Sequence, residues 1–213
     1  MPLHQIQRSG PGSAWAVWKI EEEADVLSAA LPQADQCPEE INFLRKRLEW
    51  LGGRFLINYL LTGEGLNYQG LAKEESGKPY PVGLDYQITL SNSFPFVAAQ
   101  IHPTMPVGID LEFLRPKMAQ VIPRVLSPEE QIDAGNDALK LCIYWSAKEA
   151  LYKIYGKRNL IFSRHLLVEP FILSESGILN CRIILRDQLW NVQLEYISGP
   201  EYILTATKSV EKK

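Results

Sequence analysis

The sequence contains few of the residues that build disulfide frameworks or zinc sites. Among its 213 residues are three cysteines, three histidines and three methionines. The cysteines, Cys37, Cys142 and Cys181, are widely spaced and form no CxxC pair. An odd number at this spacing argues against both kinds of site and favours a reducing compartment. We therefore expect a cytoplasmic protein.

Long apolar runs and an excess of one charge are also missing. No stretch approaches ~18 uninterrupted apolar residues, so no membrane-spanning helix is expected. The net charge of −3 gives no general attraction to nucleic acid or to an anionic membrane. Hydrophobic residues make up 46% of the chain, which is enough to bury a substantial core. These properties predict a soluble globular protein that binds neither nucleic acid nor membrane.

Helical and strand patterns are interleaved along the chain. We expect helices at 21–31, from Pro38 to about Leu61, after the capping-box sequence Ser127–Glu130, and at 138–155 between Asp137 and Gly156. Gly63 to Asp85 is expected to be a long loop. Strands are expected at 14–20, 88–90, 96–101, 107–112, 179–185, 190–196 and 202–207. Helices mixed with antiparallel hairpins predict the α+β class.

The longest expected helix carries an apolar stripe. Its members recur at steps of three and four: Ile41, Leu44, Leu48, Leu51, Phe55 and Tyr59. A break at Pro103 and Pro106 then divides the chain near its middle, and a helix-plus-hairpin pattern occurs on both sides. We expect two pseudo-symmetric lobes, residues 1–105 and 106–213, each a helix packed on a small antiparallel sheet. Two lobes in one chain can form a cleft without a second subunit, so we expect a monomer.

Two acidic residues alternate with apolar ones in the strand Val107 to Glu112. Strand side chains alternate between faces, so Val107, Ile109 and Leu111 are expected to share the buried face. Asp110 and Glu112 then point the same way on the other face. Two carboxylates at positions i and i+2 suit Mg²⁺, although a solvated strand face is the commoner reason for such a pair.

The helix around Trp145 favours the metal interpretation. Trp145, Glu149 and Lys153 are spaced four residues apart and lie along one face, with Lys148 in a neighbouring row. An exposed Glu–Lys pair alone would be worth only about 0.3–0.5 kcal/mol. Such a pair does not explain why a tryptophan, an acid and a base share one face of an apolar helix.

Basic residues in the first half suit a ligand with several phosphates. Arg47 and Arg54 are seven residues apart on the long expected helix, and Gly77-Lys78-Pro79 holds a lysine between a flexible and a rigid residue. A solvated basic helix face is the alternative.

Four segments in this order resemble the larger, two-lobed (surfactin-synthetase-activating) type of the 4′-phosphopantetheinyl transferase superfamily. They are Gly77–Pro79, Ile88–Ser93, Val107–Glu112 and Trp145–Lys153. The resemblance implies two α+β lobes, coenzyme A as donor, Mg²⁺ as cofactor and an apo acyl or peptidyl carrier protein as acceptor. It implies transfer of the phosphopantetheine group to a carrier serine with release of 3′,5′-ADP, the activity of a holo-[acyl-carrier-protein] synthase.

The resemblance also implies roles for single residues. Asp110, Glu112 and Glu149 correspond to the metal-binding acids, and Lys153 to a lysine near the pyrophosphate. As a mechanistic hypothesis, Lys153 would stabilise the leaving 3′,5′-ADP. Glu149 is the candidate base for the serine hydroxyl, directly or through a metal-bound water. Coenzyme A contacts are expected from a further set: Arg47, Arg54, Lys78, Pro79, Ser91, Asn92 and Lys148.

Two positions depart from the family pattern. Asn92 stands where the family usually has a histidine, and an asparagine cannot carry the positive charge that suits the 3′-phosphate of coenzyme A. Tyr155 to Leu160 replaces a glycine-rich segment, and Lys157 and Arg158 add positive charge there.

Two alternatives to the transferase remain at this stage. Asn92 favours a non-catalytic relative that only binds coenzyme A or a carrier protein. Asp110 and Glu112 alone would also suit a metal-dependent phosphohydrolase, although no further His- or Asp-rich motif accompanies them.

Overall fold

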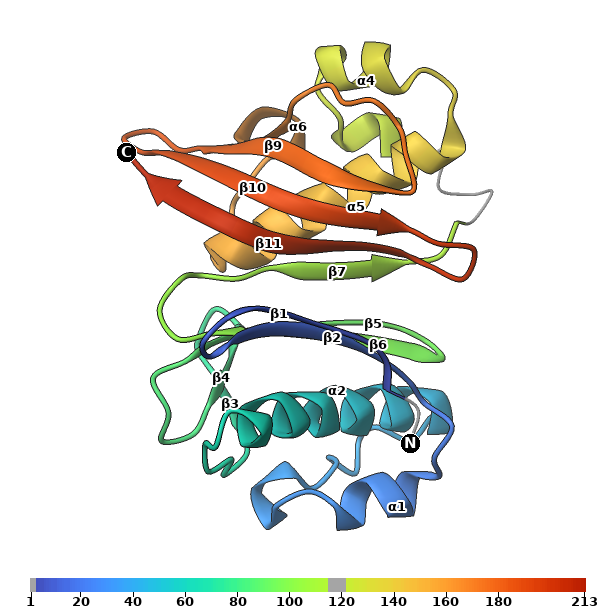
Figure 1. Ribbon diagram of the computed structural model, residues 1–213, viewed down its shortest axis with the longest axis vertical. Coiled ribbons are helices and arrows are strands. Elements are labelled where there is room, and N and C mark those ends of the chain that lie inside the picture. Colours follow the sequence, from blue (N-terminus) through green and yellow to red (C-terminus); the bar gives the residue numbers. More distant parts are fainter. Residues whose placement is uncertain (1–2, 115–121) are drawn as a thin grey trace. The chain divides into compact units, whose positions relative to one another are not determined.

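The computed structural model describes residues 3–114 and 122–213, which fall into two compact units, Met1–Val107 and Gly108–Lys213 (Figure 1). Both units combine helices with antiparallel sheets, which confirms the α+β class predicted from the sequence. Within the described residues, no helix is both long enough and apolar enough to cross a membrane.

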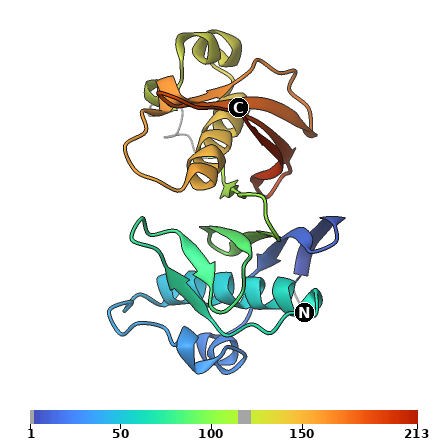
Figure 2. The ribbon, with the colours of Figure 1, turned by 90° about the vertical axis from the view of Figure 1, so that its left-hand side faces the viewer.

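The first unit is a four-stranded antiparallel sheet covered by one long helix. The sheet has the strand order β1-β2-β6-β5, and β3 and β4 form a separate hairpin. The elements are β1 (Leu3–Gly10), β2 (Ser13–Lys19), α1 (Ala24–Ala29), the short 3₁₀ helix η1 (Gln33–Asp35), α2 (Leu44–Gly63), β3 (Leu71–Lys73), β4 (Pro79–Pro81), β5 (Gln87–Ser93) and β6 (Phe96–His102). Figure 2 shows α2 lying against one face of this sheet.

The second unit is a five-stranded antiparallel sheet with the order β7-β11-β10-β9-β8. Its long helix α5 packs mainly on β7, β11 and β8. The elements are β7 (Ile109–Glu112), the 3₁₀ helix η2 (Ile122–Val125), α4 (Pro128–Ala134), α5 (Ala138–Tyr155), α6 (Phe162–His165), β8 (Leu166–Val168), β9 (Ser176–Ile184), β10 (Leu189–Ser198) and β11 (Ile203–Lys212).

The ends of the second unit's helices follow from their capping residues. Ser127 accepts a hydrogen bond from the Glu130 backbone while the Glu130 side chain accepts one from Ser127 N, so the predicted capping box is confirmed. Asp137 accepts from Leu139 N and Lys140 N at the start of α5. Gly156 ends α5 in the left-handed conformation, with φ 70°. The predicted bounds of this helix are therefore confirmed.

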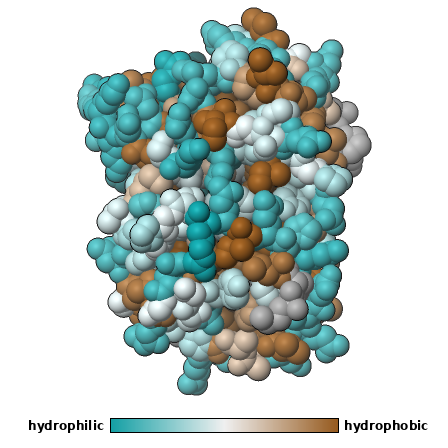
Figure 3. All heavy atoms as spheres, viewed as in Figure 1, coloured by the Kyte–Doolittle hydropathy of each residue, from teal (hydrophilic) through white to brown (hydrophobic). Residues whose placement is uncertain are grey.

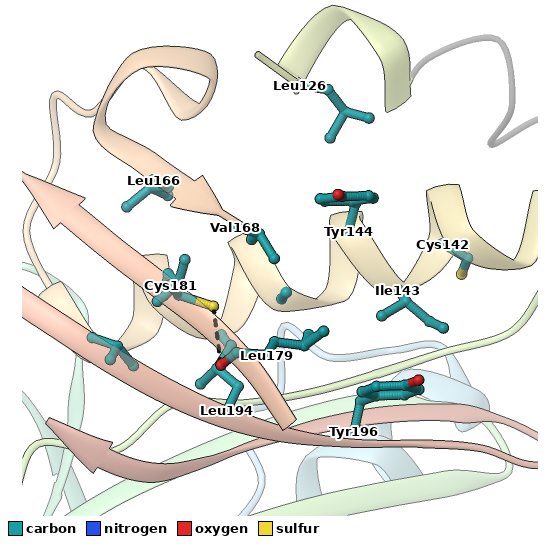
Figure 4. Close-up of a cluster of buried hydrophobic side chains, with 14 of the residues drawn as sticks. Leu126, Cys142, Ile143, Tyr144, Leu166, Val168, Leu179, Cys181, Leu194 and Tyr196 are labelled. Atoms are coloured by element: carbon teal, nitrogen blue, oxygen red, sulfur yellow. Dashed lines mark hydrogen bonds between the residues drawn. The ribbon is translucent and has the colours of Figure 1, made fainter. Parts of the chain in front are cut away.

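Each unit has its own hydrophobic core. In the second unit, apolar side chains of α5, β8, β9 and β10 converge, including Ile143, Leu166, Leu179 and Leu194 (Figure 4). In the first unit, α2 packs Leu56, Ile57 and Leu60 against the sheet. On the face seen in Figure 3, exposed apolar residues form small groups among hydrophilic ones. Stability within each unit thus comes mainly from a helix buried on a sheet.

Several expectations about the first unit are wrong in detail. Helix α2 begins at Leu44 rather than at Pro38, and Leu44 is 65% exposed. The buried face of α2 includes Gly52 and Gly53 with Leu56 and Ile57, whereas Phe55 and Tyr59 are only partly buried. Ile41 fits the helical spacing of the apolar stripe, although it lies before the start of the helix.

The sequence analysis also failed to predict strands that are short or exposed. The expected loop from Gly63 to Asp85 contains the β3–β4 hairpin, which the prolines at both ends of β4 concealed. Strand β1 was not expected because its residues are largely polar and exposed. Helix α6 and strand β8 are four and three residues long, too short for a periodic signal.

Candidate active site

The acidic strand lies at one edge of the second sheet. Among the residues that the structure describes, β7 pairs with β11 alone, in a register that places Asp110 opposite Thr205. Val107, Ile109 and Leu111 are buried, as the alternation predicted. Asp110 is also buried, at 4% exposure, whereas Glu112 is partly buried. The carboxylate face of β7 is therefore covered by protein instead of being solvated.

Helix α5 provides this cover, and Gly108 lets it come close. A Cβ atom on Gly108 would lie 2.0 Å from the carbonyl oxygen of Ala150 and 2.9 Å from a side-chain carbon of Ile154. Any larger residue would collide with the helix backbone, so this position requires glycine for close approach. The contact presses the α5 face that carries Trp145, Glu149 and Lys153 onto β7.

Two hydrogen bonds tie that helix face to the two acids of β7. Lys153 Nζ donates to Asp110 Oδ1 at 2.9 Å and to the carbonyl oxygen of Ile109 at 2.8 Å. Trp145 Nε1 donates to Glu112 Oε1 at 2.9 Å. The Trp145 ring stacks on Phe162 with 6.1 Å between ring centroids. The structure thus brings together the acids and the lysine that the sequence placed on separate elements.

Glu149 lies within the electrostatic influence of both other acids. Its pKa is raised to about 7, first by burial, then by the Asp110 carboxylate and to a smaller extent by Glu112. The ammonium of Lys153 opposes this shift. The Glu149 carboxyl group is consequently poised to gain or lose a proton near neutral pH.

The three carboxylates supply hard oxygen donors of the kind that Mg²⁺ prefers. Across residues 3–114 and 122–213, no three His, Cys, Asp or Glu side chains are already arranged as a metal site. The ammonium group of Lys153 opposes the repulsion among Asp110, Glu112 and Glu149. The residues therefore fit a divalent cation by donor type and charge, with side-chain rearrangement required.

A pocket in the first unit brings together some of the residues expected to bind coenzyme A. It has a volume of about 440 Å³ and is lined by Trp50 and Arg54 of α2 and by Ser91 and Asn92 of β5. Ser91 is buried and Asn92 is exposed. Arg47, Lys78 and Pro79 do not line this pocket: Arg47 is exposed on α2, and Lys78 Nζ donates to Gln87 Oε1 at 3.2 Å.

Arg54 is held rigidly at the pocket wall. Its guanidinium lies over the Trp50 ring, 3.4 Å from the centroid, and its Nε donates to Asp35 Oδ1 at 3.1 Å. Asp35 also accepts from Leu71 N at 3.1 Å and from the Tyr68 hydroxyl. Asp35 was not singled out from the sequence, because it lies outside any motif and reaches Arg54 through the tertiary fold.

Lys148 has a different position from the one expected. Its side chain is fully buried, and Nζ pairs with Glu130 Oε2 at 2.7 Å. The same ammonium donates to the carbonyl oxygens of Phe162 and Leu166. Glu130 also accepts from Val168 N at 2.8 Å, so this pair connects α4, α5 and β8. This position is that of a core cation and gives no support to the expected contact with coenzyme A.

Comparison with known proteins identifies the second half of the chain. Residues 106–207 match the family described as the 4′-phosphopantetheinyl transferase superfamily, abbreviated ACPS. The chain matches no curated protein. The matched segment contains Asp110, Glu112, Glu149 and Lys153, whereas the pocket of the first unit lies outside it. Residues 106–207 of this chain therefore belong to the 4′-phosphopantetheinyl transferase superfamily.

Proposed function

We propose that the chain transfers the 4′-phosphopantetheine group of coenzyme A to a serine hydroxyl of an apo acyl or peptidyl carrier protein. The observation that carries this proposal is the convergence of Asp110, Glu112, Glu149 and Lys153 within the segment that matches the family. Family membership supports phosphopantetheinyl transferase activity in general. The chemistry of this cluster supports the metal-dependent form of the reaction, releasing 3′,5′-ADP.

In this proposal Asp110, Glu112 and Glu149 hold Mg²⁺, which would neutralise charge on the phosphoryl group. Glu149 takes the proton of the attacking serine hydroxyl, which is a poor nucleophile until a base removes that proton. A pKa of about 7 suits this role, because the group is then partly ionised at neutral pH. Lys153 keeps Asp110 in place and supplies positive charge for the leaving 3′,5′-ADP.

The first unit contributes coenzyme A binding in this proposal. Arg54 presents a guanidinium that is already fixed by Asp35 and Trp50, so little side-chain entropy is lost when a phosphate binds. Ser91 and Asn92 add hydrogen-bonding groups to the same pocket. Arg47, Lys78 and Pro79 are proposed to make further contacts outside it. We place the activity in the cytoplasm and expect the chain to act as a monomer of the two-lobed type.

The direct test is incubation with coenzyme A, Mg²⁺ and an apo carrier protein, followed by mass spectrometry of the carrier. We expect a mass gain equal to one phosphopantetheine group. Glu149→Gln and Asp110→Ala should abolish the gain, whereas Glu175→Gln, an exposed acid outside the cluster, should leave it intact. Full activity in either cluster variant would overturn the site assignment, and no gain with any of several carriers would overturn the function.

Asn92 favours a second candidate, a relative that binds coenzyme A without transferring anything. Its exposed amide offers the 3′-phosphate a neutral hydrogen bond, where a charged donor would be stronger by about 1 kcal/mol. Calorimetry with coenzyme A and with its 3′-dephospho form separates the candidates. Binding of both forms without any carrier modification would select the non-catalytic relative. Carrier modification would eliminate it.

A further inference from the structure

Trp145 lies on the α5 face that carries Glu149 and Lys153, yet it takes no part in the proposed reaction. Its indole Nε1 donates to Glu112 Oε1 at 2.9 Å, so one edge of the ring holds a proposed metal ligand. The side chain is only partly buried, and a tryptophan ring turns about two side-chain bonds. Because a turn of the ring would break the hydrogen bond, the position of Glu112 depends on what fixes the indole.

The ring of Phe162, on the short helix α6, lies against this indole. The two rings are stacked, with 6.1 Å between centroids and 28° between planes. The Phe162 ring also lies 5.5 Å from that of Tyr152, which follows Trp145 by seven residues and is therefore on the same side of α5. A ring that contacts both aromatic residues covers one face of the indole and fills the space into which it can turn.

The backbone of Phe162 is itself anchored by two side chains. Lys148 Nζ donates to the carbonyl oxygen of Phe162 at 3.1 Å and to that of Leu166, directly after α6. His165 Nδ1 accepts from Ile161 N at 2.8 Å, directly before α6. The Lys148 ammonium is fully buried, so this anchor lies in the interior of the second unit. A helix of four residues is too short to be stable alone, and these contacts hold Phe162 in place.

A series of contacts thus connects the interior of the second unit with a proposed metal ligand. If position 162 only filled space in the core, an aliphatic side chain of similar size would serve there. Here the Phe162 ring has a stacked partner in Trp145, and that partner donates to the Glu112 carboxylate. Groups that orient a metal ligand without touching the metal often determine how tightly the metal binds. The arrangement is therefore that of a support for Glu112.

We propose that Phe162 is a positioning residue for the three acids: its ring fixes the Trp145 indole, whose N–H orients the Glu112 carboxylate for a divalent cation. The inference rests on the proposed function, which supplies the metal-binding role of Glu112. It adds a residue from outside the strand and the helix that carry the acids. It also explains why a tryptophan shares a helix face with an acid and a base.

The first test measures Mg²⁺ binding to the full-length chain by calorimetry, without coenzyme A or a carrier protein. Phe162→Leu should raise the Kd for Mg²⁺ by about three- to tenfold, because one aromatic pair is lost. Phe162→Tyr keeps the ring and should stay within about twofold of the wild type. The matched control is Phe171→Leu, which removes a partly buried ring of the same unit that contacts Tyr144 and Tyr196 instead. This control should bind Mg²⁺ like the wild type.

A double-mutant cycle separates positioning from a general loss of packing. Trp145→Phe removes the indole N–H while keeping an aromatic ring, and it should raise the Kd for Mg²⁺ by about tenfold. In that background Phe162→Leu should add less than about twofold, because the group that Phe162 positions is gone. Equal effects of Phe162→Leu in both backgrounds would overturn the proposal, since the loss would then come from packing and not from the orientation of Trp145.

A second measurement needs no metal, which keeps the role of Phe162 distinguishable from the proposed function. In proton–nitrogen NMR correlation spectra of the metal-free chain, the indole signal of Trp145 is identified by its loss in Trp145→Phe. Phe162→Leu should move this signal and speed its exchange with water, whereas Phe171→Leu should leave it unchanged. An indole signal that is unchanged in Phe162→Leu would also overturn the proposal. If the signal and the Kd respond as expected but no carrier protein is modified, the role of Phe162 stands and the proposed function fails.

Discussion

At the scale of single residues, Glu149 is the most informative side chain. The strand alternation at 107–112 and the four-residue spacing at 145–153 were enough to predict that one helix face and one strand face carry the acids. They were not enough to predict burial, because the covering of Asp110 depends on how closely α5 approaches β7. The raised pKa of Glu149 follows from that burial and from two neighbouring carboxylates, and no local pattern encodes it.

The raised pKa predicts a pH-dependent loss of stability in the metal-free chain. The pKa of Glu149 increases from an ordinary 4.5 to about 7 on folding, so the folded state prefers the protonated form. The protonated Glu149 carboxyl group therefore contributes up to about 3 kcal/mol to the free energy of unfolding. This contribution is complete below pH 4.5 and is lost as the pH rises through 7. Glu149→Gln should remove this dependence. Urea unfolding of both proteins in EDTA at pH 5 and pH 8 measures it, and a wild-type-to-variant difference that does not change with pH would contradict it.

Magnesium should restore part of that stability. A divalent cation bound by Asp110, Glu112 and Glu149 favours the ionised carboxylates and stabilises the folded state by mass action. At pH 8, thermal unfolding of the wild type should therefore shift upward by a few degrees as Mg²⁺ is added. The shift should be largely absent in Asp110→Ala and retained in Glu175→Gln. Equal shifts in all three proteins would indicate non-specific ion effects and would contradict a site at these acids.

Lys148 shows how a motif position can take a structural role. Because its ammonium is fully buried against Glu130, Lys148→Met leaves an uncompensated buried carboxylate and should cost about 3–5 kcal/mol of unfolding free energy. Adding Glu130→Gln removes that charge while keeping the capping box, so the double variant should recover much of the loss. Urea unfolding and a carrier-modification assay on the folded double variant test this. Loss of coenzyme A affinity in a fully folded double variant would show that Lys148 contacts the donor after all.

At the scale of elements, the accuracy of the sequence prediction depended on whether an element carries its own end signals. Helix α5 was predicted to the residue because Asp137 and Gly156 cap it. Helix α2 has no capping side chain at its start, and apolar residues continue before Leu44, so its beginning was misplaced. The packing of α5 on β7 depends on one small residue, Gly108, whose importance is visible only when the two elements are brought together.

Glycine substitutions test that close approach. Gly108→Ala places a Cβ against the carbonyl of Ala150 and should cost about 1–3 kcal/mol of unfolding free energy, since backbone must move. It should also weaken the Trp145–Glu112 and Lys153–Asp110 hydrogen bonds and reduce transfer activity. Gly53→Ala, in helix α2, is the matched control. A Cβ atom at this position would contact the Leu90 side chain at an ordinary distance of 3.5 Å. That variant should be neutral or more stable by up to about 1 kcal/mol, because alanine is the better helix former. Equal destabilisation of both variants by thermal unfolding would refute the argument.

At the scale of the whole molecule, the chain consists of two units whose buried clusters do not mix residues. One cluster runs from Ala14 to Ile101 and the other from Ile122 to Ile203. The three acids and Lys153 belong to the second unit, while Arg54, Ser91 and Asn92 belong to the first. The sequence motifs predicted which half of the chain carries each of these residues. The pocket of the first unit could not be predicted, because it is formed by residues that are distant in sequence, such as Trp50 and Ser91.

The location of the acids in the second unit and of the pocket in the first unit predicts which binding properties an isolated second unit should keep. A fragment of residues 106–213 contains a complete sheet, the helix that covers it and an unshared core, so it should unfold cooperatively. It should keep the Mg²⁺-dependent rise in unfolding temperature at pH 8, because all three acids are present. It should bind coenzyme A much more weakly than the full chain, because the pocket containing Arg54 is absent, and it should not modify a carrier protein. Circular dichroism melts and calorimetry measure these properties, with Asp110→Ala in the same fragment as the control. If the intact chain responds to Mg²⁺ and the folded fragment does not, the metal site needs the first unit. If the fragment binds coenzyme A as strongly as the intact chain, the pocket of the first unit is not part of the donor site.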